Sequence, residues 1–467
     1  LNARNTALQS TPTVSVSIIA RKSIAGRDIE RSGTLRATRL DTNASAIAKD
    51  TTPTAVPGVP NVSNTVSGGH NVTFTWPRVA TATSYSLDWR KNGGSWVSGG
   101  TAIDNNSRSY TVTDGTHEDV IEARVRANNV VGNSAYGSSS ADIPLWAPLI
   151  VQAGWTDYGA SYSTAAYTKT ASGIVMLRGL LKSSTTPAAY SVIASLPDDY
   201  KPSGRLIFGT STAPNASARI DIEPRAGGAD VLYGTGGNPG WLSLDTIRYI
   251  PANTALTKNT PTFQNGYSNY AGGGAYEPVT YVQDSTSRVT VQGLVSPGTL
   301  TNGTIIFTLP AAMRPAKYQH HASRAEAFAH LGIDPASGML AKGDGTGFLS
   351  LNSSFLPASY TSWTNLTLVN GWVWYDGSSG MFSTPQYTKT SDNVVQLKGL
   401  IRSGSTTYDT NIATLPAGFR PKGRLIYTTG NSGGYARLDI LPTGEIRFDG
   451  STNGWQALDN VMFIAEL

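Results

Sequence analysis

Apolar and polar residues alternate with a period of two along most of this chain, in short runs separated by Gly, Pro, Asn and Ser. Such alternation is typical of half-buried β-strands, and frequent turn residues are typical of antiparallel sandwiches and barrels. Stretches with the 3.6-residue period of amphipathic helices are missing. The pattern therefore predicts an all-β chain and argues against coiled coils, helical solenoids and a large α/β enzyme.

The first 52 residues, 1–52, are polar and basic. Two alternating runs, 13–19 and 34–40, predict strands there. A segment this short cannot bury a core alone, so these strands need a partner, either the next domain or another chain. A disordered, solvated arm is the alternative.

Most of the net charge lies at the amino-terminal end of the chain. The net charge is +5, and residues 1–50 hold eight Lys/Arg and four Asp/Glu, so +4 of it lies there. The remaining sequence carries no basic stripe of the kind that nucleic-acid-binding domains use, so we expect no nucleic-acid partner. No apolar run approaches the roughly 18 residues of a membrane span, so we expect no membrane insertion.

Residues 53–145 show short predicted strands that contain Trp76 and Trp89. They close with the run V-R-A-N-N-V-V-G-N-S at 125–134. This stretch resembles a fibronectin type III domain, because the Asn and Gly of the closing run resemble the family's turn between its last two strands. The resemblance implies a seven-strand sandwich that acts as a spacer, with both Trp rings used in packing.

After residue 145 one pattern occurs three times. The motif V-x-L-[R/K]-G-L-[L/I] at 175–181 recurs at 395–401, and a diverged form stands at 291–295; the distance from its Gly to the Pro of a following Leu-Pro is 18, 17 and 17 residues. Copies of about 105 residues can each close a two-layer core. We therefore predict an extended modular chain with three tandem antiparallel β-sandwich, jelly-roll-like domains at 146–255, 256–358 and 359–467.

Metal-ligating side chains are scarce. The chain has no Cys and five His, and its one His cluster is His320-His321 with Glu326 and His330, a spacing that resembles a helical pair of zinc ligands. Alignment of the copies places His330 on a strand, which favours a structural role. Lys342-Gly343-Asp344-Gly345 is interpreted as a turn rather than a calcium or integrin-type motif. We expect no metal and no cofactor.

The sequence also offers few candidate catalytic groups. No G-x-S-x-G elbow is present, and the best carboxylate pair is Asp221 and Glu223, which project to one side of a predicted strand as a glycosidase would require. Arg219 lies on that same face, so we interpret the group as a solvated charge ladder. The third copy keeps Asp439 but has Leu441. We therefore expect a protein without enzymatic activity.

Aromatic residues beside Asp, Asn and Gly supply the most suggestive chemistry. They open the first and third copies, and a late aromatic recurs in all three copies, at position 348 in the second. A pyranose has an apolar face that stacks on such rings and hydroxyls that need polar partners. The alternative is that the rings pack the sandwiches. The candidate saccharide-binding residues are Trp155, Tyr158, Trp241, Trp372, Trp374, Tyr375 and Trp455.

The order of motifs in 146–467 resembles the C-terminal domains of bacteriophage tail fibre and receptor-binding proteins. The shared features are an opening Trp-x-x-Tyr, Y-T-K-T, the glycine motif, L-P-x-x-[FY]-[RK]-P-x-G-R-L-I and a late Gly-Trp. The second copy departs by losing Y-T-K-T and G-R-L-I. The resemblance implies a homotrimer in the phage tail, outside the cell, whose segment 1–52 contacts other tail proteins and whose sandwiches bind a host cell-surface glycan.

Two other functions stay open. The sandwiches could be purely structural spacers of a tail, with the receptor bound by a different chain. They could also be the accessory carbohydrate-binding region of a secreted polysaccharide-degrading enzyme, which predicts a monomer.

Overall fold

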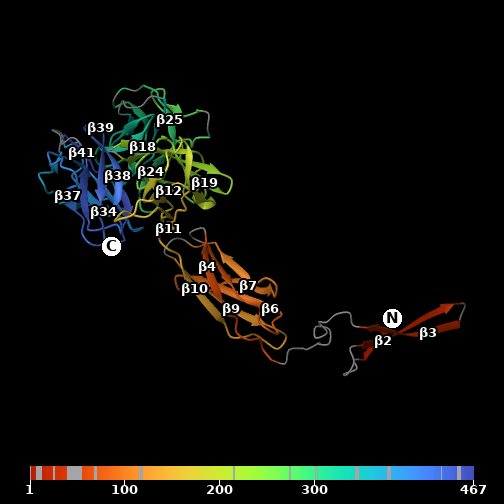
Figure 1. Cartoon of the computed structure of the whole chain (residues 1–467). Coiled ribbons are helices and arrows are strands. Elements are labelled where there is room, and N and C mark those ends of the chain that lie inside the picture. Colours follow the sequence, from red (N-terminus) through yellow and green to blue (C-terminus); the bar gives the residue numbers. More distant parts are fainter. Residues whose placement is uncertain are drawn as a thin grey trace. The chain divides into compact units, whose positions relative to one another are not determined.

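The computed structural model describes residues 2–6, 13–24 and 27–38 by their backbone, and beyond them residues 55–67, 71–113, 115, 119–213, 216–272, 275–299, 301, 303–341, 347–375, 380–432, 434–449 and 454–466. The chain forms two compact units: Leu1–Thr65 with Thr73–Val112 and Val120–Ala141, and Val66–Val72 with Thr113–Asp119 and Asp142–Leu467. The described residues contain strands and two 3-10 turns, Asp198–Tyr200 and Ala311–Met313, but no α-helix (Figure 1). The all-β prediction is confirmed. None of the described helices is long and apolar enough to span a membrane.

The amino-terminal segment forms a three-stranded antiparallel sheet in the order β1-β2-β3. Its strands are β1 (Asn2–Thr6), β2 (Thr13–Ile24) and β3 (Arg27–Thr38). Both predicted strands are confirmed, and both are longer than the sequence pattern indicated, because β2 and β3 pair as one hairpin from Thr13↔Thr38 to Ile24↔Arg27. Residues 39 and 40 of the second predicted strand lie outside the described residues.

Residues 55–145 form a fibronectin type III-like sandwich. A three-stranded sheet, β4-β5-β8, faces a four-stranded sheet, β10-β9-β6-β7. The strands are β4 (Ser63–Ser67), β5 (Asn71–Thr75), β6 (Ser84–Lys91), β7 (Val97–Asp104), β8 (Ser109–Val112), β9 (Val120–Asn128) and β10 (Gly137–Asp142). Side chains of β9 alternate between buried and half-buried, as its sequence pattern indicates. Trp76 packs edge-on against Tyr85 in the core, with ring centroids 5.6 Å apart, while Trp89 is half-buried.

The first of the three copies, 146–255, contains two antiparallel sheets, β11-β13-β14-β21 and β12-β15-β20-β17-β18-β19-β16. Its strands are β11 (Ala147–Pro148), β12 (Trp155–Asp157), β13 (Ala166–Lys169), β14 (Val175–Arg178), β15 (Leu180–Ser183), β16 (Ser191–Pro197), β17 (Leu206–Thr212), β18 (Ala216–Arg225), β19 (Gly228–Tyr233), β20 (Leu242–Ser243) and β21 (Arg248–Tyr249). We call this segment copy 1, and 256–358 and 359–467 copies 2 and 3.

Copy 3 repeats the topology of copy 1 strand for strand, as β32-β34-β35-β42 and β33-β36-β41-β38-β39-β40-β37. Its strands are β32 (Thr364–Asn365), β33 (Val373–Trp374), β34 (Gln386–Lys389), β35 (Val394–Lys398), β36 (Leu400–Arg402), β37 (Thr410–Thr414), β38 (Leu425–Asn431), β39 (Gly434–Ile440), β40 (Glu445–Asp449), β41 (Gln456–Ala457) and β42 (Met462–Ile464). The shared motifs of the two copies therefore correspond to a shared fold.

Copy 2 keeps the strand order but splits its larger sheet, giving β22-β25-β30, β26-β29-β28-β27 and β23-β24-β31. Its strands are β22 (Ser268–Asn269), β23 (Thr280–Gln283), β24 (Val289–Gln292), β25 (Leu294–Ser296), β26 (Ile305–Thr308), β27 (Gln319–Arg324), β28 (Phe328–Asp334), β29 (Gly338–Ala341), β30 (Leu349–Ser350) and β31 (Ser353–Phe355). Each copy has its own apolar core, drawn from its own residues.

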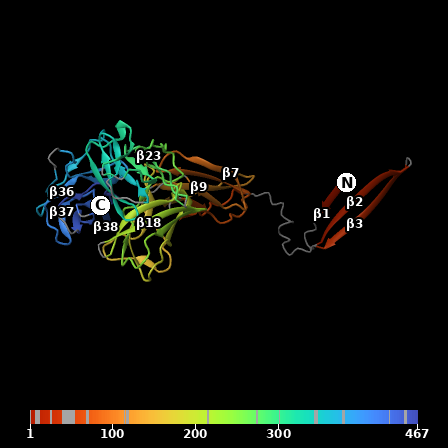
Figure 2. The same ribbon diagram turned by 90° about the horizontal axis from the view of Figure 1, so that it is seen from above.

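The three copies pack around a pseudo-threefold axis, so the expectation of an extended modular chain is wrong for 146–467, where each copy buries one strand face against the other two. The equivalent strands β17, β27 and β38 each contact the other two. In Figures 1 and 2 the blue strands of copy 3 accordingly lie beside the yellow-green strands of copy 1. Single parallel bridges join the copies in cyclic order, at Arg205↔Tyr276, Tyr318↔Phe382 and Arg424↔Tyr162. One chain thus contains a closed ring of three sandwiches.

Burial in these central strands reflects the two neighbours that each of them has. Every residue of β38 is buried, including Thr428, Thr429 and Asn431. A strand with one face on its own core and the other on neighbouring copies loses the polar solvent face. Buried polar side chains in it must find partners, and the Thr428 hydroxyl lies 2.7 Å from the hydroxyl of Ser211 in copy 1.

One aspartate ties copy 1 to copy 3. Asp245 Oδ1 accepts a hydrogen bond from the backbone N–H of Gly179 in its own copy at 2.8 Å, and Oδ2 accepts one from the N–H of Ile426 in copy 3 at 2.6 Å. The side chain is buried, and this desolvation raises the pKa of Asp245 to about 7.

The same bridge recurs at the other two contacts between copies. Asp459 accepts hydrogen bonds from the N–H of Gly399 at 2.8 Å and from the N–H of His320 in copy 2 at 2.9 Å. In copy 2 the equivalent residue is Asn352, whose oxygen accepts from Gly293 and whose amide nitrogen donates to the carbonyl oxygen of Ile207 in copy 1 at 2.9 Å. Burial also raises the pKa of Asp459, to about 6.

A fully buried arginine joins all three copies at a second point. Arg288 Nη1 donates to Ser172 in copy 1 at 3.3 Å and to Asp284 in its own copy at 3.1 Å. Its guanidinium also donates to Thr390 at 2.7 Å and to both oxygens of Asp392 at 3.2 Å in copy 3. Because a buried charge needs paired and hydrogen-bonded partners, this residue favours one arrangement of the three copies.

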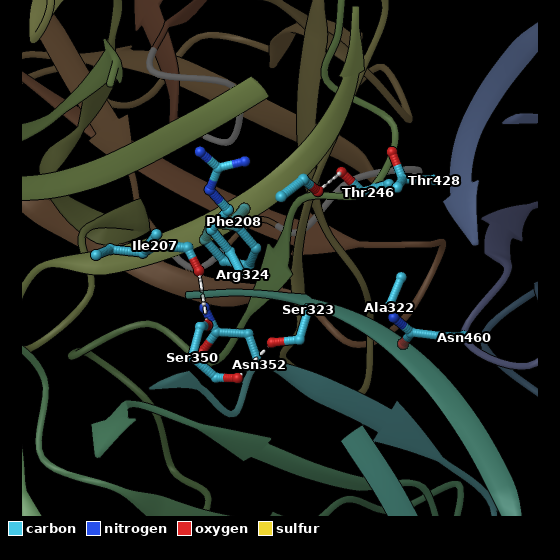
Figure 3. Close-up of a pocket in the computed structure, with 11 residues that line it drawn as sticks. Ile207, Phe208, Thr246, Ala322, Ser323, Arg324, Ser350, Asn352, Thr428 and Asn460 are labelled. Carbon is cyan, nitrogen blue, oxygen red and sulfur yellow. Dashed lines mark hydrogen bonds between the residues drawn. The ribbon is translucent and has the colours of Figure 1, made fainter. Parts of the chain in front are cut away.

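The three central strands enclose a small cavity, which Figure 3 shows. It has a volume of about 20 Å³, room for roughly one water molecule, and its wall includes the equivalent residues Gly209, Ala322 and Thr428. Thr246 donates to the carbonyl oxygen of Gly209 at 3.2 Å at its edge. A cavity of this size cannot hold a saccharide.

Candidate functional site

Aromatic residues gather where neighbouring copies meet. We name these three contacts seam 1–2, seam 2–3 and seam 3–1, after the copies that form them. Each copy brings an edge-to-face pair of rings to a seam, with centroids 5.3, 5.1 and 5.7 Å apart. The pairs are Tyr158–Tyr162, Tyr270–Tyr276 and Tyr375–Phe382.

Seam 2–3 contains the most extensive set of stacked rings. The imidazole of His320 in copy 2 stacks between two copy 3 rings, Trp455 at 4.8 Å and Phe382 at 5.5 Å. Tyr375 contacts Phe382 edge-on, and Tyr318 contacts it from copy 2 at 5.7 Å. The predicted residues Tyr375 and Trp455 therefore belong to one connected set of rings.

An exposed surface continues from this set, and we name it the aromatic face: Val373, Trp374, Tyr375, Met381 and Phe382. Trp374 is 37% exposed, and its indole N–H donates to the carbonyl oxygen of Ser383 at 3.0 Å, which fixes the ring in one orientation. Val373 and Met381 are exposed, and the Arg402 guanidinium lies 5.3 Å from the Tyr375 ring centre. A fixed, solvent-exposed indole suits stacking against a sugar ring.

Two other predicted residues, Tyr158 and Trp241, lie at seam 3–1. Tyr158 is exposed and packs on Tyr162, above which lies the Arg424 guanidinium at 5.3 Å. Trp241 lies under the Arg437 guanidinium at 4.9 Å. An open groove beside Tyr162 is lined by residues of both copies, including Ser161 and Lys422.

The remaining two predicted residues, Trp155 and Trp372, lie in the cores of copies 1 and 3. They are only 6% and 3% exposed, and their rings pack edge-on against Tyr233 at 5.7 Å and Phe448 at 5.1 Å. With both faces covered, neither ring can stack on a ligand. We therefore correct the candidate set by removing both residues.

The expectation of a solvated charge ladder is wrong for Asp221, which is 0% exposed. Arg205 Nε donates to its Oδ2 at 2.7 Å, and Arg219 donates to both carboxylate oxygens at 2.6 Å. Only Glu223 is exposed as expected. Copy 3 repeats the triad with Arg424, Arg437 and Asp439. Recurrence of R-x-D at 219–221 and 437–439 was the signal that the sequence interpretation missed.

The His cluster is structural. His320 and His321 lie on β27 and His330 on β28, and Glu326 stands in the turn between these strands. Ser353 Oγ lies 2.5 Å from His321 Nδ1 and Gln319 Oε1 lies 3.0 Å from Nε2, and burial lowers the pKa of this ring well below its usual value. Among the described residues, no three His, Asp or Glu side chains are grouped as a metal site would require.

Comparisons with known proteins assign the chain to no family. No family model matches the chain, and no curated protein matches it. Among solved structures, a protein titled FN3tt mut is 19% identical over 19% of this chain and 99% of its own, with a TM-score of 0.17. The FN1-FN3 domains of chicken CNTN1 are 10% identical over 88% of this chain and all of theirs, with a TM-score of 0.18. A Ca²⁺-stabilized adhesin of an Antarctic bacterium, described as binding ice, is 12% identical over 88% and 92%, with a TM-score of 0.16. At these values the matches say nothing about function.

Proposed function

We propose that this chain is a phage tail fibre or receptor-binding protein that holds a host cell-surface saccharide without covalent chemistry. The observation that carries the proposal is the aromatic face, where the exposed Trp374 ring is held by its hydrogen bond to Ser383 beside Tyr375. Rings of this kind stack on the apolar face of a pyranose, and neighbouring polar groups serve its hydroxyls.

The ring of three copies adds multivalency to this proposal. Positions equivalent to Tyr375 are Tyr158 in copy 1 and Tyr270 in copy 2, and each pairs with a second ring. Several weak sites on one body raise the effective concentration of ligand, so avidity can exceed single-site affinity by roughly a hundredfold. A homotrimer of chains, attached to other tail proteins through 1–52, would multiply the sites again.

Glycan-array binding by the full-length chain tests the proposal. We expect binding to a host envelope saccharide, and a loss of at least about tenfold in affinity for Trp374→Ala, because truncating an anchoring ring removes more than about 1.4 kcal/mol. The matched control is Trp363→Ala, since Trp363 lies outside the aromatic face and is covered by Lys398 at 3.8 Å. Trp363→Ala is expected to bind like the wild type.

The outcome that contradicts the proposal is a wild-type chain that binds no envelope saccharide. That result favours the structural spacer, because it leaves the seam rings with a packing role alone. Light scattering on the intact chain separates the remaining alternative. The accessory region of an enzyme predicts the mass of one chain, 49.3 kDa, and the fibre predicts three times that mass.

A further inference from the structure

The equivalent seams differ in their balance of charge. Around Asp439, at seam 3–1, three guanidiniums face four carboxylates, and each guanidinium lies within 4 Å of at least one of them. The cations are Arg424, Arg437 and Arg447, and the anions are Asp409, Asp439, Glu445 and Asp449. Positive charge at this seam is therefore fully compensated.

Seam 1–2 lacks two of these carboxylates and one of the cations, because Leu232 stands where copy 3 has Arg447. Tyr190 stands where copy 3 has Asp409, and Gly234 stands where it has Asp449. The exposed Tyr190 ring lies over the guanidiniums of Arg205 and Arg219, at 5.1 and 5.3 Å. A ring offers these cations a weak attraction, whereas a carboxylate would neutralise them.

Copy 2 adds a third cation to the same seam. Arg324 stands where copies 1 and 3 have Ser211 and Gly430. It is 8% exposed, and its guanidinium donates to two neutral acceptors, the hydroxyl of Ser217 at 3.3 Å and the carbonyl oxygen of Glu326 at 3.0 Å.

Arg324 forms no ion pair in the part of the chain that the structure describes, although Asp221 acts on it from a longer distance. No described carboxylate lies within 4 Å of it, and its buried Nε has no acceptor. Burial and the neighbouring Arg219 guanidinium lower the pKa of Arg324, and Asp221 offsets only part of this shift. A buried cation without an anion is costly, and proteins accordingly pair such groups. Arg205 and Arg219 share Asp221, Arg205 also reaches the exposed Glu223, and among the described residues neither carboxylate lies within 4 Å of Arg324.

We propose that seam 1–2 binds an anionic group, a phosphate or a carboxylate, between Arg219 and Arg324. This inference rests on the proposed saccharide-binding function and deepens it, because it makes the ligand an acidic saccharide. Guanidinium N–H groups bind both kinds of anion. Because Asp221 already takes Nε and Nη2 of Arg219, the anion binds the third nitrogen, Nη1, together with the Nε of Arg324. Tyr190, exposed beside them, gives the attached sugar ring a surface on which to stack.

Calorimetric titration of the full-length chain tests the inference with inorganic phosphate, glucuronic acid and neutral glucose as probes. We expect phosphate or glucuronic acid to bind, with glucose weaker, and the stronger anion identifies the source. Arg324→Ser, which copies the equivalent residue of copy 1, is expected to weaken anion binding at least about tenfold. Arg225→Ser is the control, since Arg225 is an exposed copy 1 arginine paired with Asp230. It is expected to bind like the wild type.

A second pair of variants tests the missing carboxylate directly. Tyr190→Asp introduces the residue that copy 3 has at this position, Asp409, and both positions have a backbone φ of 63°. The added carboxylate is expected to abolish anion binding because it neutralises the positive charge of seam 1–2. Tyr190→Asn removes the ring without adding charge and should keep phosphate affinity within about threefold.

The outcomes separate this inference from the proposed function. A wild type that binds neither anion, or an Arg324→Ser variant that binds as the wild type does, overturns the anion site. Anion binding without any envelope saccharide binding supports the site and overturns the saccharide function. Saccharide binding that depends on Trp374 but not on Arg324 supports the function and overturns the inference.

Discussion

The hydrogen bonds of Asp245 predict how strongly the ring of copies depends on one side chain. Asp245→Ala removes the acceptor for two buried backbone donors, the N–H of Gly179 and the N–H of Ile426. A buried donor left without a partner costs about 1–3 kcal/mol, so two of them cost about 2–6 kcal/mol.

Differential scanning calorimetry of the full-length chain at pH 5.5 measures this loss. At that pH the carboxyl group, whose pKa is about 7, carries its proton, so its removal relieves no buried charge. At about 2.1 cal/mol/K per residue, one kcal/mol shifts the melting temperature of the ring 146–467 by about 1.5 °C, so we expect a fall of at least about 3 °C. Hydrogen exchange should accelerate at the amide of Ile426.

The control is Asp198→Ala in the same copy. Asp198 is exposed and bonds the Lys201 ammonium at 2.7 Å, an interaction of the kind that contributes about 0–1 kcal/mol. We expect its melting temperature to stay close to that of the wild type. A fall of less than about 1 °C for Asp245→Ala, or exchange at Ile426 as slow as in the wild type, would refute the reasoning.

Two further changes probe the same ring of copies. Arg288→Ile introduces the equivalent residue of copy 1 and leaves Asp284 and Asp392 buried without a counter-charge. It should lower the free energy of unfolding by about 3–5 kcal/mol. Adding Asp284→Thr and Asp392→Ser, again the residues of copy 1, should recover most of that loss in calorimetry, and an unrecovered loss contradicts the charge argument. Burial raises the pKa of Asp245 to about 7 and that of Asp459 to about 6, whereas an unfolded Asp has a pKa of about 3.9. Between about pH 4 and 7 the folded chain therefore keeps protons that the unfolded chain releases. The contribution of these two groups to the free energy of unfolding falls as the pH rises through that window. The control is the double variant Asp245→Asn with Asp459→Asn, in which neither side chain titrates. From pH 4.5 to pH 8 the melting temperature of the wild type should therefore fall relative to that of the double variant, and a difference that stays constant or changes in favour of the wild type contradicts this.

Sequence reasoning located candidate rings but could not say which of them are exposed. Trp372 and Trp374 stand two residues apart, yet the first is buried against Phe448 and the second is exposed. Two residues apart on one strand would point to the same side, but β33 begins at Val373, so Trp372 lies outside the strand and Trp374 lies in it. The position of Trp374 is also special to copy 3, because Asp157 and Asn269 stand there in the other copies.

The seam residues were harder still to predict. Arg324 falls in a polar run that reads as an ordinary exposed strand, and its partner Ser217 lies 107 residues away. The local sequence around Arg324 and around Ser217 gives no sign that the two residues are in contact. The R-x-D recurrence at 219–221 and 437–439 was visible, but alternation alone placed those side chains on a solvated face, whereas the neighbouring copy covers them.

The sequence by itself determined the β class, the fibronectin type III-like module and the threefold repetition, because alternation, turn residues and motif spacing are local properties of the chain. Tertiary structure alone decided that the three copies close into a ring around β17, β27 and β38. That closure depends on hydrogen bonds and charges between residues more than a hundred positions apart, such as Asp245 with Ile426 and Arg288 with Asp392. It also decides which rings and which cations are left for a ligand, since a side chain is buried or exposed according to the copy that packs on it.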